Sequence, residues 1–227
     1  MGGHELLRAW QLNNIGAVRG IRGDRGAALL ASQQALALKE KALGRDHPDV
    51  GVSEGNIAVE LIGLSRNQEA LTHVDRAIAL MENGLGASHP DLATQLSNRG
   101  EILGALGRQR EARQSFERAR VIWERELGLE DRNLAYALTG IGLAYLADND
   151  PGSALAPLER AYKIREAHEV DPSRRAETRF ALARSLWETN RDRVRARALA
   201  EQAREGYAKS ALKPKAAEVE SWLHTRG

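Results

Sequence analysis

Apolar residues in the segment 91–132 recur at the spacing of two amphipathic helices separated by a turn. The turn is expected at Gly107 and Arg108, where the apolar pattern stops. The residues that share one helical face are Leu92, Leu96, Ile102, Leu103 and Leu106 before the turn, and Ala112, Phe116, Ala119, Ile122 and Trp123 after it. The segment therefore predicts a helical hairpin with an apolar interior.

This hairpin pattern recurs along the chain with a period of 42 residues. Gly100, Ala112 and Ala119 correspond to Ala58, Ala70 and Ala77 one period earlier, and to Gly142, Ala154 and Ala161 one period later. Self-similarity of this kind is typical of stacked helical hairpins. We therefore predict an all-α solenoid of five hairpins over residues 7–48, 49–90, 91–132, 133–174 and 175–211, with a C-terminal capping helix in 212–227.

The linkers between the first hairpins repeat the tripeptide His-Pro-Asp, at 47–49 and at 89–91. Proline is favoured in the first turn of a helix, and the aspartate adds a negative charge near the positive end of the helix dipole. A metal site at these positions is an alternative, but one His and one Asp cannot complete a four-ligand zinc shell. The tripeptide therefore predicts helix starts. Gly44, which precedes the first linker, predicts a left-handed C-cap.

The small residue in the middle of the first helix and the Ala–apolar–Ala set of the second helix resemble the tetratricopeptide repeat. In the third hairpin these are Gly100, Ala112, Phe116 and Ala119. The 42-residue period and the His-Pro-Asp linkers resemble the kinesin-light-chain type of this repeat. The resemblance implies a right-handed superhelix whose inner wall, formed by the first helices, binds a partner peptide.

A second resemblance covers residues 176–187 and 195–208, which are rich in alanine and arginine. These segments are similar to repeat arrays that follow the catalytic domain in bacterial serine/threonine protein kinases of the myxobacterial type. The chain has no Gly-rich phosphate loop, HRD loop or DFG motif. This resemblance implies, as an alternative function, a non-catalytic arm, free-standing or truncated, that regulates a kinase domain in cis or in trans.

The first helices supply the positions expected on the inner wall. Those positions are Trp10, Asn13, Asn14, Asn56, Ser97, Asn98, Glu101, Tyr136, Thr139, Arg184 and Trp187. Asn14, Asn56 and Asn98 are each 42 residues apart, so stacking is expected to form a column of amides that can bind a peptide backbone. Alternatively, these asparagines are solvated or bonded to a neighbouring helix. The aromatic residues of the set are either partner anchors or inter-repeat packing residues.

Related arrays that bind a C-terminal carboxylate combine Lys, Asn and Arg. At the expected clamp positions this chain has Ala17, Ile21, Val59, Gly63 and Ala105, which argues against a carboxylate ligand. The arginines between 174 and 204 could attract nucleic acid. They lie on several helix faces, however, and aromatic residues are only 4% of the chain, so a solvated basic surface is the simpler interpretation.

Composition limits the remaining function classes. The 227 residues carry a net charge of +2 and no cysteine, and 28% of them are charged. A mean hydropathy of −0.46, with no apolar run of about 18 residues and no signal region, predicts a soluble cytoplasmic protein. No nucleophile–base set, metal-ligand cluster or cofactor motif is present, so we expect no enzyme and no cofactor. The predicted function is a protein–protein interaction scaffold.

Overall fold

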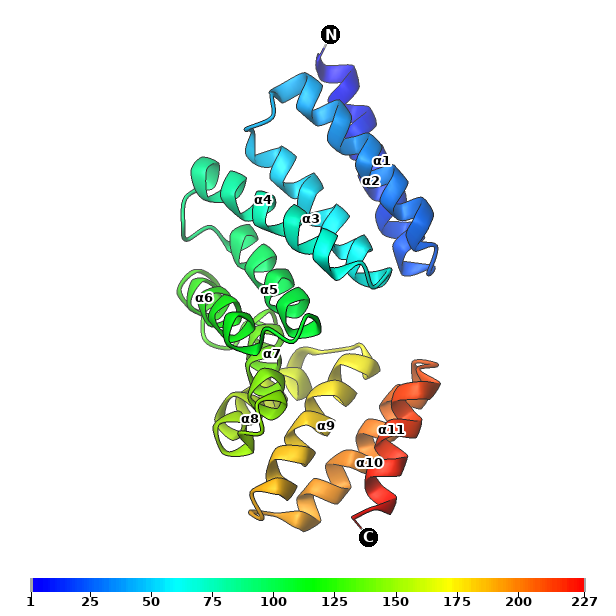
Figure 1. Cartoon of the computed structure of the whole chain (residues 1–227), viewed down its shortest axis with the longest axis vertical. Helices are drawn as coiled ribbons and strands as arrows, with labels where there is room; N and C mark the ends of the chain where they lie inside the picture. Colours follow the sequence, from blue (N-terminus) through cyan, green and yellow to red (C-terminus); the bar gives the residue numbers. More distant parts are fainter. Residues whose placement is uncertain (1, 227) are drawn as a thin grey trace. The chain divides into compact units, whose positions relative to one another are not determined.

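The computed structural model describes residues 2–226, and these residues form helices joined by short loops, without a strand. The prediction of an all-α repeat fold is confirmed. The helices are α1 (Gly2–Ile21), α2 (Arg25–Leu43), α3 (Pro48–Gly63), α4 (Asn67–Leu85), α5 (Pro90–Ala105), α6 (Gln109–Leu127), α7 (Leu134–Ala147), α8 (Pro151–His168), α9 (Pro172–Glu188), α10 (Arg193–Lys209) and α11 (Lys213–His224) (Figure 1).

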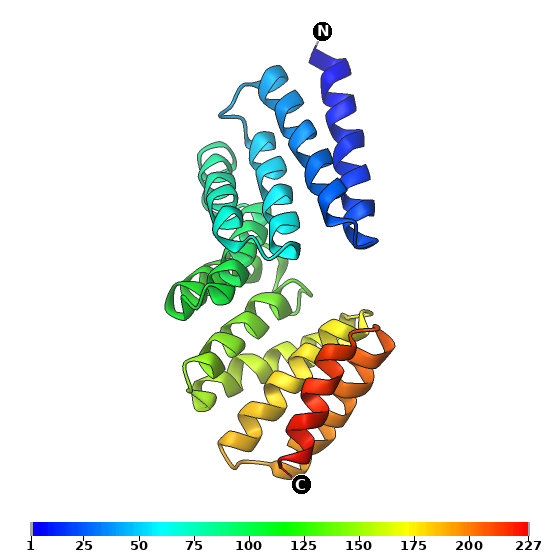
Figure 2. The ribbon, with the colours of Figure 1, turned by 45° about the vertical axis from the view of Figure 1, so that its right-hand side comes forward.

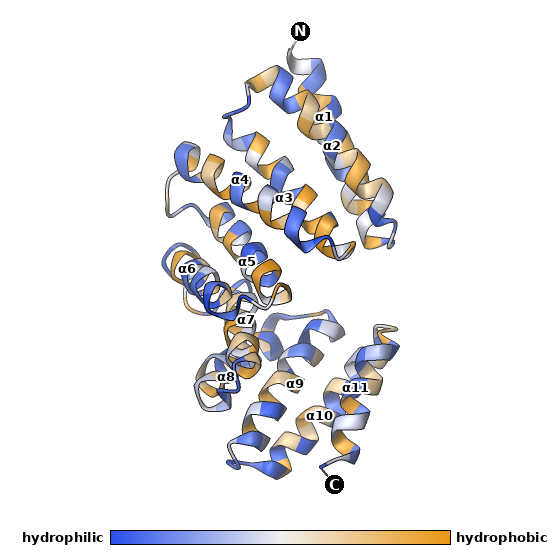
Figure 3. Ribbon diagram, in the orientation of Figure 1, coloured by the Kyte–Doolittle hydropathy of each residue, from blue (hydrophilic) through white to orange (hydrophobic). Residues whose placement is uncertain are grey.

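The chain divides into two compact units, residues 1–122 and 123–227, which we describe separately. In unit 1, α1 packs on α2, α3 on α4, and the hairpins contact each other through α2 and α3 and through α4 and α5. In unit 2, α7 packs on α8 and α9 on α10, with α8 against α9. Apolar and polar residues alternate around these helices (Figure 3), and each hairpin buries its apolar side.

Helix α11 extends unit 2 beyond its last hairpin by packing against α10 (Figure 2). Val219 is fully buried, and the Trp222 ring lies edge-on to Phe180 and Trp187, with centroid distances of 5.8 and 5.7 Å. The exposed side of α11 is polar, with Lys213, Lys215, Glu218, Glu220 and Ser221. The helix therefore covers an apolar surface of unit 2 with a hydrophilic exterior.

The His-Pro-Asp linkers begin α3 and α5 by a means that the sequence did not indicate. Pro48 and Pro90 occupy the first turn, as predicted. The preceding histidine is the N-cap: His47 Nδ1 accepts a hydrogen bond from the Asp49 N–H at 3.1 Å, and His89 Nδ1 from the Asp91 N–H at 3.2 Å. Each imidazole thereby satisfies one of the unpaired N–H groups at the helix start.

Glycine ends the helices that precede these linkers. Gly44 and Gly86 have φ angles of 87° and 91° with ψ of 158° and 161°. This region is accessible to glycine alone, and it differs from the left-handed helical cap expected at Gly44 because ψ is extended. The extended ψ turns the chain away from the helix and into the linker.

Replacing the capping histidines should therefore destabilise unit 1. We expect His47→Ala and His89→Ala each to lower the free energy of unfolding by about 1 kcal/mol, the usual loss for an N-cap. Urea unfolding followed by circular dichroism measures this change. His89→Asn, which restores a capping acceptor, should recover most of the loss, and equal destabilisation by alanine and asparagine would contradict the capping role.

Ion pairs link the second helices of successive hairpins within each unit. In each pair an arginine reaches a glutamate 36 residues earlier, on the preceding second helix. The pairs are Arg76–Glu40 and Arg118–Glu82 in unit 1, and Arg160–Glu124 and Arg195–Glu159 in unit 2. Exposed pairs of this type each contribute little to stability.

Candidate functional site

A cavity of about 270 Å³ lies on unit 1 between α1, α2 and α3. We call it the α1–α3 cavity. Helices α1 and α3 contribute its sides and α2 contributes part of its floor. Its lining residues are Asn13, Ala17, Gly20, Ile21, Arg25, Ser32, Asn56, Val59 and Glu60. The cavity therefore brings together two predicted binding residues, Asn13 and Asn56, from different hairpins.

The two amides provide the hydrogen-bonding groups of the cavity. Asn56 is half-buried. The Oδ1 atom of Asn13 is buried, and no residue that the structure describes donates a hydrogen bond to it. Leaving a buried polar atom unpaired costs about 1–3 kcal/mol. An incoming group that supplies the missing partner would remove this cost, and a peptide group can do so in either orientation of the amide because it carries both a donor and an acceptor.

An ion pair closes the floor of the cavity. Arg25 Nη1 donates to Glu60 Oε2 at 2.9 Å, and their side chains are 35% and 9% exposed. Two glycines leave room for this pair: a Cβ at Gly20 would lie 2.7 Å from Glu60 Oε1, and a Cβ at Gly63 would lie 2.7 Å from Arg25 Nε. Because the opposite charges neutralise each other, the floor is polar but carries no net charge.

The rim of the cavity is apolar. It contains Ala17, Ile21 and Val59, and the last two side chains are 88% and 38% exposed. These are positions where a carboxylate-binding array would place charged residues, and their replacement agrees with the sequence-based argument against a carboxylate ligand. The cavity thus combines apolar surface at the rim with amides inside, an arrangement that suits a peptide segment with an apolar side chain.

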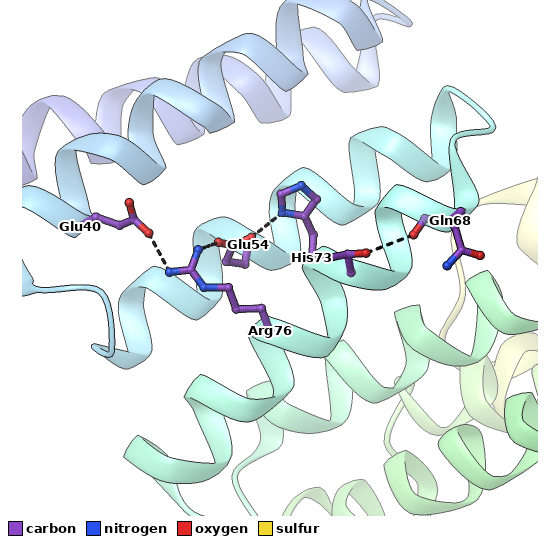
Figure 4. A network of polar contacts seen from close by, with 6 residues as sticks. Glu40, Glu54, Gln68, His73 and Arg76 are labelled. Atoms are coloured by element: carbon purple, nitrogen blue, oxygen red, sulfur yellow. Dashed lines mark hydrogen bonds and ion pairs between the residues drawn. The ribbon is translucent and has the colours of Figure 1, made fainter.

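A polar network centred on the buried Glu54 side chain joins α3 to its neighbouring helices (Figure 4). The Glu54 side chain is 1% exposed, lies 2.5 Å from His73 Nδ1, and accepts a hydrogen bond from the Arg76 guanidinium. Arg76 also donates to Glu40 Oε1 at 2.7 Å. The network therefore connects α3 to α4 and to α2, and it holds the helix that carries Asn56 and Val59.

The other predicted residues of unit 1 lie outside the cavity. Asn98 is half-buried and donates to Gln95 Oε1 at 3.3 Å, so its amide bonds to a neighbouring side chain. Ser97 is half-buried and Glu101 is exposed, both on α5. Asn14 and Trp10 are exposed on α1 and do not line the cavity, whereas the adjacent Asn13 does. Of the predicted asparagine column, Asn56 is the member that the cavity contains.

The predicted residues of unit 2 pack mainly against their own neighbours. The guanidinium groups of Arg165 and Arg174 lie 4.9 and 4.4 Å from the centroid of the Tyr136 ring, and burial lowers the pKa of Arg165. Trp187 is half-buried between Trp222 and Arg193, and Arg184 is half-buried. Tyr136 and Trp187 therefore act as packing residues within unit 2, the second of the two roles considered from the sequence.

Thr139 requires a correction. The repeat pattern places it on the inner wall, but its side chain is 2% exposed and its Oγ1 lies 2.9 Å from Thr178 Oγ1. The two hydroxyls satisfy each other between α7 and α9, which pack directly together. Thr139 therefore presents no surface to a partner.

Sequence reasoning missed the residues at the bottom of the cavity. Arg25 and Glu60 are 35 positions apart and belong to different hairpins, so no local pattern connects them. Ser32, which is 3% exposed, comes from the second helix of its hairpin, where no inner-wall residue was expected. The signal in the sequence was a glycine in each of the first two hairpins, Gly20 and Gly63, because a glycine leaves room for a neighbouring side chain to approach the helix backbone.

Within residues 2–226, no helix is long and apolar enough to cross a membrane. In the same range no three His, Asp or Glu side chains are grouped closely enough to hold a metal ion.

Comparisons with known proteins concern the fold of this chain. A family model described as "Tetratricopeptide repeat" matches residues 6–83, 55–120 and 91–167, which together span more than half of the chain. No curated protein matches the sequence significantly.

Several solved structures have similar folds. The nearly identical TPR-like repeats assigned to a kinesin light chain of Podospora anserina are 22% identical, with a TM-score of 0.70 over 89% of this chain and 96% of that one. BtubC (BKLC) from P. vanneervenii is 21% identical, with a TM-score of 0.73 over 88% and 80%. A Rap protein complexed with Competence and Sporulation Factor is 19% identical, with a TM-score of 0.68 over 98% and 64%.

Proposed function

The chain belongs to the tetratricopeptide repeat family, and on this premise we propose that unit 1 binds an extended segment of a partner protein at the α1–α3 cavity. The role is that of a scaffold without catalytic activity. Asn13 and Asn56 bind the main chain of the segment, and one apolar side chain contacts Ala17, Ile21 and Val59 at the rim.

One observation carries this proposal. Asn13, whose Oδ1 is buried and unpaired, lines the same cavity as Asn56, so two amides from successive hairpins can bind one ligand. A main chain in extended conformation presents unpaired N–H and C=O groups at every residue, whereas a helix has already used most of them. An extended segment is therefore the partner whose chemistry matches two amides and an apolar rim.

The fold comparison supports a protein ligand. The similar Rap protein was solved in complex with Competence and Sporulation Factor. A chain of this repeat architecture can therefore bind a factor of that type. The neutral Arg25–Glu60 floor favours an uncharged stretch of the segment over a terminal carboxylate, since a carboxylate would compete with Glu60 for the guanidinium.

Removing both amides should weaken partner binding. We expect the double variant Asn13→Ala/Asn56→Ala to lose about 1–3 kcal/mol of binding free energy, because each site loses a net hydrogen bond of about 0.5–1.5 kcal/mol and separate sites are nearly additive. This corresponds to roughly a 5–150-fold weaker affinity. Isothermal titration with the segment found by pull-down and mapped by truncation measures the change.

The matched control is Gln33→Ala/Gln34→Ala, which removes two exposed amides from α2 of the same unit. This variant should bind the segment with wild-type affinity. Equal affinities for the cavity variant and the wild type would refute the amide-binding role. If the cavity variant instead loses helicity, the asparagines are structural, which is the alternative considered from the sequence.

The role as the arm of a protein kinase stays a prediction. The relatives described above include no protein kinase, and the resemblance rests on the alanine- and arginine-rich segments of α9 and α10. A kinase partner would bind as any other protein segment does, so the same titration with a kinase domain tests this alternative.

A further inference from the structure

Helix α1 exposes an apolar stripe on the side opposite its buried face, and at Ile21 this stripe adjoins the α1–α3 cavity. Its large side chains are Leu7, Trp10, Val18 and Ile21, which are 54%, 62%, 50% and 88% exposed. The exposed Asn14 lies at its centre. We call these five residues the α1 stripe. The opposite side of α1, with Ala9, Gly16 and Gly20, is buried.

The stripe contrasts with the corresponding outer side of unit 2. There, α11 presents lysines, glutamates and a serine to solvent. An apolar outer side is therefore not required by the repeat architecture itself. Four large apolar side chains on one helix face form a patch of the kind that marks interaction sites.

The spacing of the stripe is symmetric about Asn14. Leu7 and Ile21 lie seven residues before and after it, and Trp10 and Val18 lie four residues before and after it. If two α1 helices pack antiparallel around a two-fold axis at Asn14, Leu7 faces Ile21 of the second copy and Trp10 faces Val18 of the second copy. A two-fold interface requires such self-complementary spacing.

Asn14 suits the centre of this arrangement. The amide has donors and an acceptor, so two amides related by the two-fold axis can donate to each other reciprocally. A single polar residue of this type in an apolar helix seam fixes the register of the pair at some cost in stability. The geometry points to a second copy of this chain as the occupant of the α1 stripe: we propose that the chain forms a two-fold dimer through antiparallel packing of α1.

The exposed area agrees with a weak dimer. Side chains of this size and exposure present about 500 Å² on each copy, so a pair would bury about 1,000 Å², close to the lower limit for a specific interface. We therefore expect a concentration-dependent monomer–dimer equilibrium. Ile21 belongs both to the α1 stripe and to the rim of the α1–α3 cavity, so the dimer would cover part of that rim. The proposal itself does not rest on segment binding at the cavity.

Sedimentation equilibrium of the full chain tests the interface. We expect Val18→Glu to raise the dimer dissociation constant at least tenfold, because each dimer would then bury two unpaired carboxylates. The matched control is Val121→Glu, since Val121 is 53% exposed and Val18 50% exposed. The control should dimerise like the wild type, and circular dichroism should show unchanged helicity in both variants because neither side chain is buried.

Disulfide trapping tests the antiparallel geometry, since the chain contains no cysteine of its own. Oxidised Asn14→Cys should give a covalent dimer, because the two positions meet at the axis. Leu7→Cys should not, because its two copies would lie about 21 Å apart along the helices. A disulfide bridges Cα atoms only within about 7 Å.

Three results would overturn the proposal. The wild type could remain monomeric at every concentration up to about 1 mM, which would leave the stripe for a helix of another protein. Val18→Glu could dimerise as well as the wild type. Leu7→Cys could cross-link as readily as Asn14→Cys, which would show parallel or non-specific association. Because segment titration is a separate measurement, none of these results bears on the proposed function.

Discussion

Replacing Trp222 with alanine is expected to lower the free energy of unfolding of unit 2 by about 3–5 kcal/mol, the usual loss for a buried Trp or Phe. Trp222 is 9% exposed and packs edge-on against Phe180 and Trp187. Its removal would leave a cavity between α9 and α11, and it would also end two aromatic contacts. Urea unfolding followed by circular dichroism gives the loss, and hydrogen exchange should locate it in α9, α10 and α11.

The control is Trp222→Phe, which keeps a ring in place. The indole Nε1 of Trp222 is buried, and no described residue accepts its hydrogen bond. Phenylalanine removes this unpaired donor while losing some volume, so the expected cost is below about 1.5 kcal/mol. If Trp222→Ala and Trp222→Phe lower the free energy of unfolding of unit 2 equally, packing of the aromatic ring does not hold α11 in place.

Replacing Gly142 with leucine is expected to cost about 3 kcal/mol, at the upper end of the range for overpacked interiors. A Cβ at Gly142 would lie 2.4 Å from Leu158 Cγ and 2.5 Å from its Cδ2. Leucine favours a helix over glycine by about 1 kcal/mol. The clash exceeds this gain, because Leu158 Cγ is near its own backbone and α7 and α8 must separate.

A second glycine in the same hairpin gives the matched control. Gly152 is exposed in the first turn of α8, and its nearest atom to an added Cβ is Asp150 Oδ1 at 3.7 Å. Gly152→Leu should therefore leave the stability unchanged or slightly raised. Thermal unfolding of both variants measures the difference. Equal stability of the two leucine variants would mean that the approach of α7 to α8 is not limited at Gly142.

The repeat positions that involve packing could be predicted from the sequence. Gly100 and Gly142, one period apart, each face a large side chain of the following helix: a Cβ at Gly100 would lie 2.8 Å from the Phe116 ring. Such positions recur because every hairpin must bring its two helices equally close. Burial of one helix face is a periodic property, and the sequence therefore predicted the all-α fold.

The capping histidines and the ion pairs were not predicted, although the histidines and three of the four pairs recur with the period. Histidine is not among the preferred N-cap residues, so the linkers were predicted as helix starts from their proline and aspartate, with no capping role for His47 and His89. Glu40 and Arg76 are joined across two hairpins, and their separation along the chain is 36 residues rather than 42. A comparison of charged residues at the repeat positions would have detected these pairs.

The candidate site depended on details that periodicity cannot supply. A shift of 42 residues selects Asn14, but the neighbouring Asn13 lines the cavity because its side chain points between α1 and α3. Asn98, also at the predicted position, bonds to Gln95. Cavities form where three helices leave space, and that space depends on individual neighbours such as Gly20 and Gly63 rather than on a repeated residue type.

The most direct test of the proposed function is NMR of the ¹⁵N-labelled chain titrated with the mapped partner segment. Side-chain NH₂ groups of asparagine report their own hydrogen bonds. The account predicts that the NH₂ resonances of Asn13 and Asn56 shift in proportion to occupancy, while those of Gln33 and Gln34 on α2 do not move. Saturated binding with the Asn13 and Asn56 resonances unchanged would contradict it, because the segment would then occupy another surface.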